Sequence, residues 1–244
     1  MSVLVVTGTG TDVGKTAVTA AIAAAHIAHG ERVAVLKPAQ TGAAGHAPGD
    51  IDEIVRLVPG VTGCELARYP EPLAPEAAAR RSGLGEVSCA LAARVVAELV
   101  RHYDLVLVEG AGGLLVRMAG DGTTLADLAS AVAAPVLIVS SAGLGTLNAT
   151  ALTAEALRSR GLACLGVVIG QWPATPGTAE LCNLTDLPVI AGAPVLGALP
   201  EGITGHPPAR FAAWATAGLA PSLGGTFEHT AFTQQHTSWG AVRS

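Results

Sequence analysis

The sequence predicts an α/β fold in which helices cover both faces of a doubly wound, mostly parallel sheet. Short runs of aliphatic residues alternate with longer, alanine-rich segments along the chain, and this alternation is typical of parallel strands joined by crossover helices. Hydrophobic residues make up 50% of the 244 residues but aromatic residues only 3%, so we expect a core of small aliphatic side chains. The length suits a single domain.

The C-terminal part of the chain differs from the rest. We expect residues 1–223 to form the domain, because neither an internal repeat nor a linker interrupts them. Residues 224–244 are polar and have no clear period, and we expect them to form a flexible tail.

The first element, residues 3–16, has the sequence VLVVTGTGTDVGKT. An aliphatic strand leads into a glycine-rich turn, and Lys15 and Thr16 then open a helix. Glycines let backbone N–H groups approach phosphate oxygens closely, and a helix N-terminus adds unpaired donors. Lys15 supplies a charge to the outer phosphates and Thr16 a hydroxyl to a magnesium ion. The sequence therefore predicts a phosphate-binding loop and a fold like that of P-loop NTPases.

The spacing of this loop departs from the common pattern, which has four residues between the first glycine and the GK[ST] group. Gly8 lies one residue too early, so the loop is a longer variant. An ordinary glycine-rich turn with a solvated lysine is the alternative. It does not explain why Lys15 and Thr16 both stand at the helix start.

The second strand is expected to bring a lysine beside this loop. A helix over residues 15–29 ends at Gly30, a residue typical of helix C-termini, and a strand over residues 33–36 leads into Lys37 and Pro38. Ligands of open parallel sheets bind outside the carboxyl ends of the strands. We therefore expect Lys37 to lie on the same rim as the phosphate loop, although a lone lysine at a strand end would be interpreted as solvated.

The segments that follow are expected to surround a site. Residues 40–49 predict a loop, and apolar residues at helical spacing follow Asp50. The local sequence favours Asp50 as the N-cap of that helix. Residues 70–75 are rich in proline and predict an irregular lid or wall.

A third apolar strand, residues 105–108, ends in Glu109. An acidic residue in this place is the pattern of a second magnesium-side residue in P-loop proteins, since Mg²⁺ takes one or two carboxylates together with phosphates and water. A solvent-facing charge is the alternative. The glycine-rich residues 110–113 permit close backbone approach to a ligand and favour the site.

The rest of the chain continues the alternation. A glycine turn within residues 143–150 feeds a helix N-terminus, and the sequence leaves open whether it is an anion site or an ordinary turn. The other expected elements are helices over residues 88–100, 123–133 and 209–217, and strands over residues 136–139, 165–169 and 195–199.

Composition excludes several classes of protein. The formal net charge of −5 argues against a general nucleic-acid binder. No apolar run of about 18 residues predicts a membrane span, and no signal peptide precedes the first strand. The 4 cysteines are scattered, so neither a zinc site nor a disulfide framework is indicated. We therefore expect a cytoplasmic protein with reduced thiols and no nucleic-acid or membrane partner.

Four stretches together point to one family. The chain has GTGTDVGKT at residues 8–16, KPAQTG at 37–42, VEGAGG at 108–113 and GTLNAT at 145–150. In order and spacing these stretches resemble dethiobiotin synthetases, and the similarity covers residues 2–217. A phosphate loop alone would leave many ATPases and GTPases open, whereas the combination is specific.

This resemblance implies a ligase of biotin biosynthesis that depends on ATP and Mg²⁺. Such enzymes join carbon dioxide, supplied as bicarbonate, to 7,8-diaminononanoate and close a cyclic urea, and they release ADP and phosphate. The implied intermediates are a carbamate and then a carbamic–phosphoric mixed anhydride. The resemblance also implies a homodimer with a substrate site at the subunit interface.

The resemblance assigns roles residue by residue. It implies that Lys15 and Lys37 are catalytic and flank the transferred phosphoryl group. The implied magnesium ligands are Thr16, Asp50 and Glu109, which changes the expectation for Asp50 from a cap to a ligand residue. The implied substrate contacts are Thr41, Gly145, Thr146, Leu147 and Asn148. The implied nucleotide contacts are Asp12, Val13, Gly14, Lys15, Thr16, Ala17, Asp50, Glu109, Gly110, Ala111, Gly112, Gly170, Gln171, Pro200, Glu201 and Gly202.

The chain departs from many members of this family beside the nucleotide base. Gln171, Trp172 and Pro173 stand where those members have an asparagine and a different loop. This difference predicts a looser preference among nucleoside triphosphates.

Three other functions share parts of the pattern. A switch ATPase of the partitioning type has the same sheet but an additional lysine near the start of the loop, where this chain has threonine and glycine. An amidotransferase-linked synthetase of the cobalamin pathway usually carries a glutaminase domain, for which 244 residues leave little room. A non-catalytic nucleotide-binding module would not need this whole set of lysine, threonine and glutamate residues.

Overall fold

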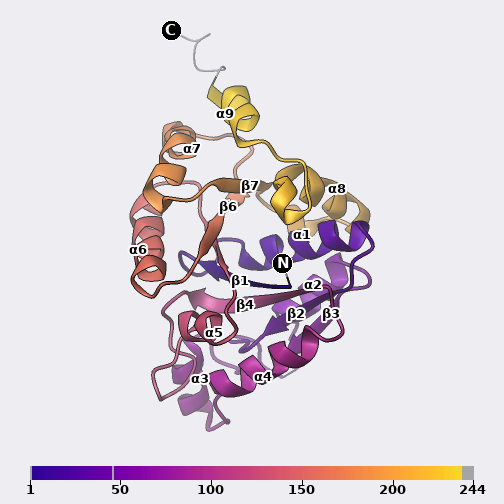
Figure 1. Cartoon of the computed structure of the whole chain (residues 1–244), viewed down its shortest axis with the longest axis vertical. Coiled ribbons are helices and arrows are strands. Elements are labelled where there is room, and N and C mark those ends of the chain that lie inside the picture. Colours follow the sequence, from indigo (N-terminus) through magenta and orange to yellow (C-terminus); the bar gives the residue numbers. More distant parts are fainter. Residues whose placement is uncertain (1, 46, 238–244) are drawn as a thin grey trace.

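Seven parallel strands form the centre of the protein in a computed structural model that describes residues 2–45 and 47–237 (Figure 1). Their order is β3-β2-β4-β1-β5-β6-β7, and each neighbouring pair is parallel. The strands are β1 (Val3–Gly8), β2 (Val33–Lys37), β3 (Thr62–Glu65), β4 (Leu105–Gly113), β5 (Val136–Ser140), β6 (Cys164–Trp172) and β7 (Val195–Pro200). The predicted parallel α/β sheet is confirmed.

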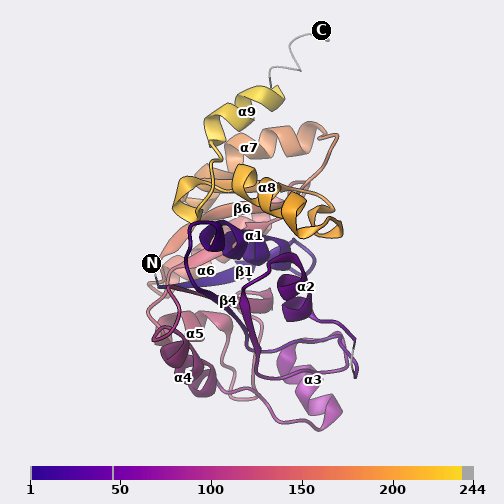
Figure 2. The ribbon, with the colours of Figure 1, turned by 90° about the vertical axis from the view of Figure 1, so that its right-hand side faces the viewer.

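Helices cover both faces of this sheet. The helices are α1 (Lys15–Ala28), α2 (Asp50–Leu57), α3 (Pro75–Ser82), α4 (Cys89–Leu99), α5 (Leu125–Ala131), α6 (Thr146–Ser159), α7 (Thr178–Ala191), α8 (Pro208–Gly218) and α9 (His229–Thr237), with short 3₁₀ turns η1 (Ile203–Gly205) and η2 (Pro221–Leu223). Helices α1, α2 and α8 share one hydrophobic core with the sheet, and α4 to α7 share the other. Figure 2 shows α1 and α8 side by side. The described part of the chain is thus doubly wound.

The inner strands are buried on both faces, as their aliphatic sequences predict. All residues of β1, β2 and β5 are buried, and β1 lies between β4 and β5. Parallel strands present their carboxyl ends at one edge of a sheet. The glycine-rich turn after β1, Lys37 at the end of β2 and Glu109 in β4 therefore converge at that edge.

Within residues 1–223, one strand and two helices were not expected from the sequence. Strand β3 contains TGCE, which has no apolar run, and it forms because β2 supplies its hydrogen-bond partners. Helix α3 follows directly on the proline-rich segment and begins at Pro75, a position where proline is tolerated. Helix α7 contains Pro188 but buries Leu184 and Leu187 against the sheet.

The C-terminal segment also differs from the expected tail. Phe227 is buried in the core, and Phe232 of α9 packs edge-on against Trp172 with ring centroids 5.3 Å apart. These aromatic contacts order residues that read as polar and aperiodic in the sequence. Residues 238–244 of the expected tail lie outside the described residues.

Among the described helices, none has both the length and the apolar character that crossing a bilayer requires.

The turn after β1 packs directly on the end of β6, and this contact needs two glycines. A Cβ atom on Gly170 would lie 2.1 Å from the carbonyl oxygen of Val13. A Cβ atom on Gly14, whose φ is 90°, would lie 2.6 Å from the carbonyl oxygen of Gly170. Because real Cβ atoms do not approach so closely, any side chain at either position would push the turn away from the sheet.

We predict that Gly170→Ala lowers the free energy of unfolding by about 1–3 kcal/mol, the usual cost of overpacking a close contact. Urea denaturation measures the change. Gly85→Ala is the matched control, since a Cβ atom there meets nothing within 4 Å, and it should change stability by less than about 0.5 kcal/mol. Equal stability of the two variants would contradict the packing argument.

Candidate functional site

Hydrogen bonds to backbone carbonyl oxygens hold the turn after β1 in place. The Thr9 amide donates to the carbonyl oxygen of Val139 at 2.9 Å, which ties the start of the turn to β5. The Lys15 ammonium folds back and donates to the carbonyl oxygen of Gly10 at 2.8 Å. Gly14 has the left-handed conformation and caps the N-terminus of α1. The predicted strand, glycine turn and helix start are thus confirmed as local structure.

Lys37 lies at the centre of a buried charge cluster. Its Nζ atom lies 2.5 Å from Asp50 Oδ2 and 2.8 Å from Glu109 Oε1, and it also donates to the carbonyl oxygen of Gly110 at 3.0 Å. Lys37 is 2% exposed and Glu109 is fully buried. The expected lysine on the rim is therefore not solvated, because two carboxylates from α2 and β4 hold it.

The charges of this cluster determine how its groups titrate. Burial alone would lower the pKa of Lys37, but Glu109 and Asp50 outweigh it and raise that pKa above its ordinary value. Burial alone would raise the pKa of Asp50, but Lys37 holds it below its ordinary value. Burial, and then the charge of Lys37, lower the pKa of Lys15. The Lys37–Asp50 pair is therefore ionised at neutral pH.

Thr16 and Glu109 present oxygen atoms beside this cluster. Thr16 Oγ1 donates to Glu109 Oε1 at 3.0 Å, while Glu109 Oε2 is buried and accepts no hydrogen bond from any described residue. Among the described residues no three His, Cys, Asp or Glu side chains form a self-contained metal cage. Mg²⁺ does not need one, since it binds through one or two carboxylates together with substrate phosphates and water. The oxygen atoms of Thr16, Asp50 and Glu109 fit that requirement.

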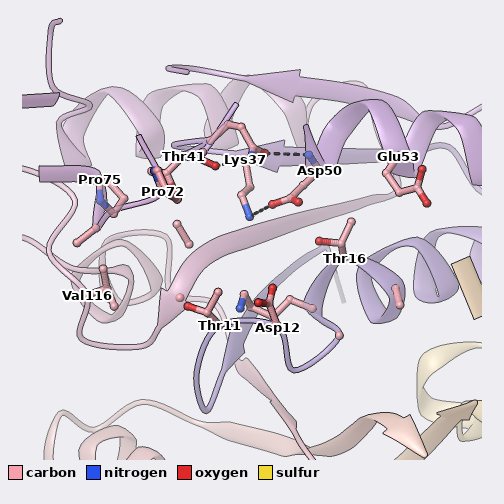
Figure 3. Close-up of a pocket in the computed structure, with 18 of the residues that line it drawn as sticks. Thr11, Asp12, Thr16, Lys37, Thr41, Asp50, Glu53, Pro72, Pro75 and Val116 are labelled. Carbon is pink, nitrogen blue, oxygen red and sulfur yellow. Dashed lines mark hydrogen bonds and ion pairs between the residues drawn. The ribbon is translucent and has the colours of Figure 1, made fainter. Parts of the chain in front are cut away.

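A cleft of about 960 Å³ opens in front of these residues. Figure 3 shows Lys37 pointing toward Asp50, with Thr16 and Asp12 on the opposite side of the cleft. Pro72 and Pro75 form an end wall with Val116, so the proline-rich segment is a wall, as predicted. The cleft is large enough for a nucleotide-sized ligand.

Many of the predicted site residues line this cleft, and Glu109 lies buried behind it. The predicted residues on its surface are Asp12, Gly14, Lys15, Thr16, Ala17, Lys37, Thr41, Asp50, Ala111, Gly112 and Gln171. Gly110 faces a smaller neighbouring cavity instead.

Two predicted segments lie close to one another at one end of the site. The Glu201 amide donates to the carbonyl oxygen of Trp172 at 2.9 Å, which joins the end of β6 to the segment after β7. Gln171 and Thr204 contribute to the cleft surface, whereas Val13, Gly170 and Pro200 to Gly202 are not among its lining residues.

The predicted segment at the start of α6 lies outside the cleft. Gly145 is the left-handed N-cap of α6, so the glycine turn does feed a helix N-terminus. None of the residues 145–148 lines the cleft. Leu144, next to them, is 92% exposed.

Several cleft residues escaped the sequence reasoning. They are Thr11, Gln40, Gly42, Glu53, Val116 and Thr204. Gln40 could have been found, because it stands between Lys37 and Thr41 in KPAQTG. Val116 and Thr204 carry no local signal, since only the packing of distant segments brings them to the cleft.

Comparisons with known proteins concern the chain as a whole. A family described as an AAA domain matches residues 2–206. An ATP-dependent dethiobiotin synthetase of Saccharopolyspora erythraea is 64% identical over 225 residues, which are 92% of this chain and 98% of that protein. One of Streptomyces avermitilis is 58% identical over 232 residues, 95% of this chain and 98% of that protein.

Solved structures support the fold. The MinC:MinD cell division protein complex of Aquifex aeolicus matches with a TM-score of 0.56 and 19% identity, over 82% of each chain. At this identity the likeness concerns the fold alone. The high identity and nearly complete coverage of the first two relatives are decisive, and the chain belongs to the dethiobiotin synthetase family.

Proposed function

We propose that this enzyme forms dethiobiotin from 7,8-diaminononanoate, carbon dioxide and ATP, with Mg²⁺ as its metal. The observation that carries the proposal is the buried Lys37, which lies beside a phosphate-loop lysine in one cleft and is held by Asp50 and Glu109. A reaction that brings ATP together with an anionic carbamate needs several fixed positive charges at one place.

The proposed reaction has three steps. One amine of the substrate attacks carbon dioxide, forms an N–C bond and loses a proton, which gives a carbamate. A carbamate oxygen then attacks the γ-phosphorus of ATP; an O–P bond forms, the bond to ADP breaks, and a mixed anhydride results. The second amine attacks the carbonyl carbon and loses a proton, the C–O bond to phosphate breaks, and phosphate leaves as the cyclic urea closes.

The residues of the cleft suit these steps. The Lys15 ammonium exchanges its hydrogen bond to the Gly10 carbonyl oxygen for contacts with the outer phosphates. Lys37, kept charged by its carboxylate neighbours, stabilises the carbamate and the transferred phosphoryl group. Thr41 contacts the diamine. Thr16, Asp50 and Glu109 would hold a Mg²⁺ ion, which would supply positive charge to neutralise the phosphates.

The substrate carboxylate is proposed to bind at the start of α6 in a second subunit. Residues 145–148 offer a helix N-terminus, which favours anions, yet they lie outside the cleft of their own chain. Leu144 and Leu152 of the same region, together with Val189 on α7, are exposed apolar residues. These features support a homodimer in which each cleft is completed by its partner.

The decisive experiment measures phosphate release from ATP and Mg²⁺ with and without the diamine and bicarbonate, with mass detection of the product. We expect release to require the diamine and a cyclic urea to form. A rate of ATP hydrolysis that is the same with and without the diamine would favour a switch ATPase instead. The same assay with CTP and GTP checks the proposed looser base preference, which a strong preference for ATP would exclude.

Lys37→Ala should lower kcat by about 10²-fold or more, the usual cost of removing a donor from a developing anion. Steady-state kinetics measure the loss, and circular dichroism confirms that the variant is folded. Arg101→Ala, which removes an exposed ion pair with Glu98, is the control and should keep full activity. Near-normal turnover of folded Lys37→Ala would refute the role of this lysine.

Mixing two inactive variants tests the shared site. Asn148→Asp places a negative charge at the start of α6 and should weaken binding of the substrate carboxylate. When Lys37→Ala and Asn148→Asp subunits exchange, one cleft of each mixed dimer carries neither substitution. We expect up to about half of the wild-type rate per mixed dimer. No recovery despite proven subunit exchange would rule out a composite site.

A further inference from the structure

One side chain that the sequence reasoning missed joins two parts of the site. Gln40 Oε1 accepts a hydrogen bond from the Asp50 amide at 2.8 Å, and Gln40 Nε2 donates to the carbonyl oxygen of Thr41 at 2.9 Å. Both ends of the carboxamide are therefore in use. Asp50 belongs to the proposed metal side and Thr41 to the proposed substrate side.

The orientation of this carboxamide is determined by its partners. A backbone amide can only donate and a backbone carbonyl can only accept. A flipped side chain would face the Asp50 amide with its own N–H groups and the Thr41 carbonyl with its own oxygen. The hydrogen-bond network thus permits one orientation.

Hydrogen bonds also hold the backbone of Gln40 in place. Its amide donates to the carbonyl oxygen of Ala67 at 2.8 Å, and its own carbonyl accepts from the Tyr69 amide at 2.8 Å. The residue is 7% exposed. A Cβ atom on Gly49 would meet both Gln40 Cδ and Arg68 Nη2 at 3.0 Å, so the chain before Asp50 passes tightly between these two side chains.

The same contacts define where helix α2 begins. Asp50 is its first residue, and Gly49 before it has no side chain that could cap the helix. The Gln40 oxygen acts as a cap from a distant segment, because it satisfies one of the free N–H groups at the helix start. Asp52 accepts from the Gly49 amide at 2.7 Å and is held in turn by Arg68 at 3.0 Å.

Holding the Asp50 backbone determines where its carboxylate lies. That carboxylate reaches the Lys37 ammonium, and it is one of the oxygen donors proposed for Mg²⁺. Displacement of the start of α2 would move Asp50 relative to Lys37, which belongs to β2. Such an anchor acts on the ion through another residue, as outer partners of metal ligands do.

We propose that Gln40 is a positioning residue, which sets the place of Asp50 on the metal side relative to Thr41 on the substrate side; the proposal rests on the roles proposed above. One buried carboxamide joins the two, so the substrate-side loop and the metal-side helix keep a fixed position relative to each other along one side of the cleft.

Two variants distinguish the effects of the two hydrogen bonds that the Gln40 carboxamide makes. Gln40→Leu keeps a similar volume but loses both hydrogen bonds. It should lower kcat by about 10- to 100-fold and raise the Mg²⁺ concentration for half-maximal rate by a similar factor. Gln40→Glu keeps an acceptor for the Asp50 amide but cannot donate to Thr41. It should raise KM for the diamine and leave the Mg²⁺ requirement within about twofold, because the Asp50 contact that governs it remains.

A binding measurement gives a readout that does not depend on turnover. Isothermal titration of a non-hydrolysable ATP analogue, with and without Mg²⁺, measures how much the ion strengthens nucleotide binding. We expect Gln40→Leu to reduce this gain by about tenfold, while Gln234→Leu, an exposed residue on α9, leaves it unchanged. Circular dichroism confirms folding, and if Gln40→Leu does not fold, Gln40→Glu carries the test.

The outcomes distinguish this proposal from the proposed function. A folded Gln40→Leu with unchanged kcat and unchanged Mg²⁺ dependence would overturn the role of Gln40. If Gln40→Glu changed the KM for the diamine and the Mg²⁺ requirement by the same factor, the assignment of Oε1 to the metal side and Nε2 to the substrate side would be wrong. A wild-type enzyme that forms no cyclic urea would refute the function instead, and the titration of the analogue would still decide the role of Gln40.

Discussion

The site depends on the neutralisation of one buried ammonium group. A lysine with 2% exposure is stable in the charged form only because Asp50 and Glu109 lie against it. Breaking a buried ion pair of this kind by removing one partner costs about 3–5 kcal/mol, because the remaining charge stays buried. The three charges come from β2, α2 and β4, so the cluster also locks these elements together. The group that we propose to meet the reacting anion is thus part of the architecture.

The parallel sheet is what brings these charges together. In such a sheet every strand ends at the same edge, and the order found here puts β2, β4 and β1 side by side. Lys37, Glu109 and the glycine turn therefore meet although they are distant in sequence. The close contact between Gly14 and Gly170 then fixes how deeply the turn sits between the strands. The strand order thus brings the charged groups together, and the absence of side chains at Gly14 and Gly170 lets the turn pack beside them.

The fold and the site carry different information about function. A cell division protein complex shares the fold at 19% identity, so the fold does not by itself define a substrate. The end of β2 and the loop after it supply Lys37, Gln40 and Thr41 to the cleft within a few residues. The Gly42 amide of this loop donates to the carbonyl oxygen of Glu71 in the proline-rich wall. A cleft with that loop on one side and the phosphate loop on the other can hold an anionic acceptor next to a nucleotide.

Elements that form for local reasons could be predicted from the amino-acid sequence. Buried parallel strands read as continuous aliphatic runs, so β1, β2, β4, β5, β6 and β7 were recognisable, and the phosphate loop is a contiguous motif. Lys37 and Glu109 were identified because strand ends share an edge. Strand β3 was not, because its residues are polar and only pairing with β2 orders it. The tertiary structure also decided the packing of α9 on Trp172, the place of Thr204 in the cleft and the anchoring of Asp50 by Gln40. Each of these depends on contacts between segments far apart in the chain, or across a loop whose path the sequence does not predict. Neither hydrophobic periodicity nor a local motif indicates such contacts.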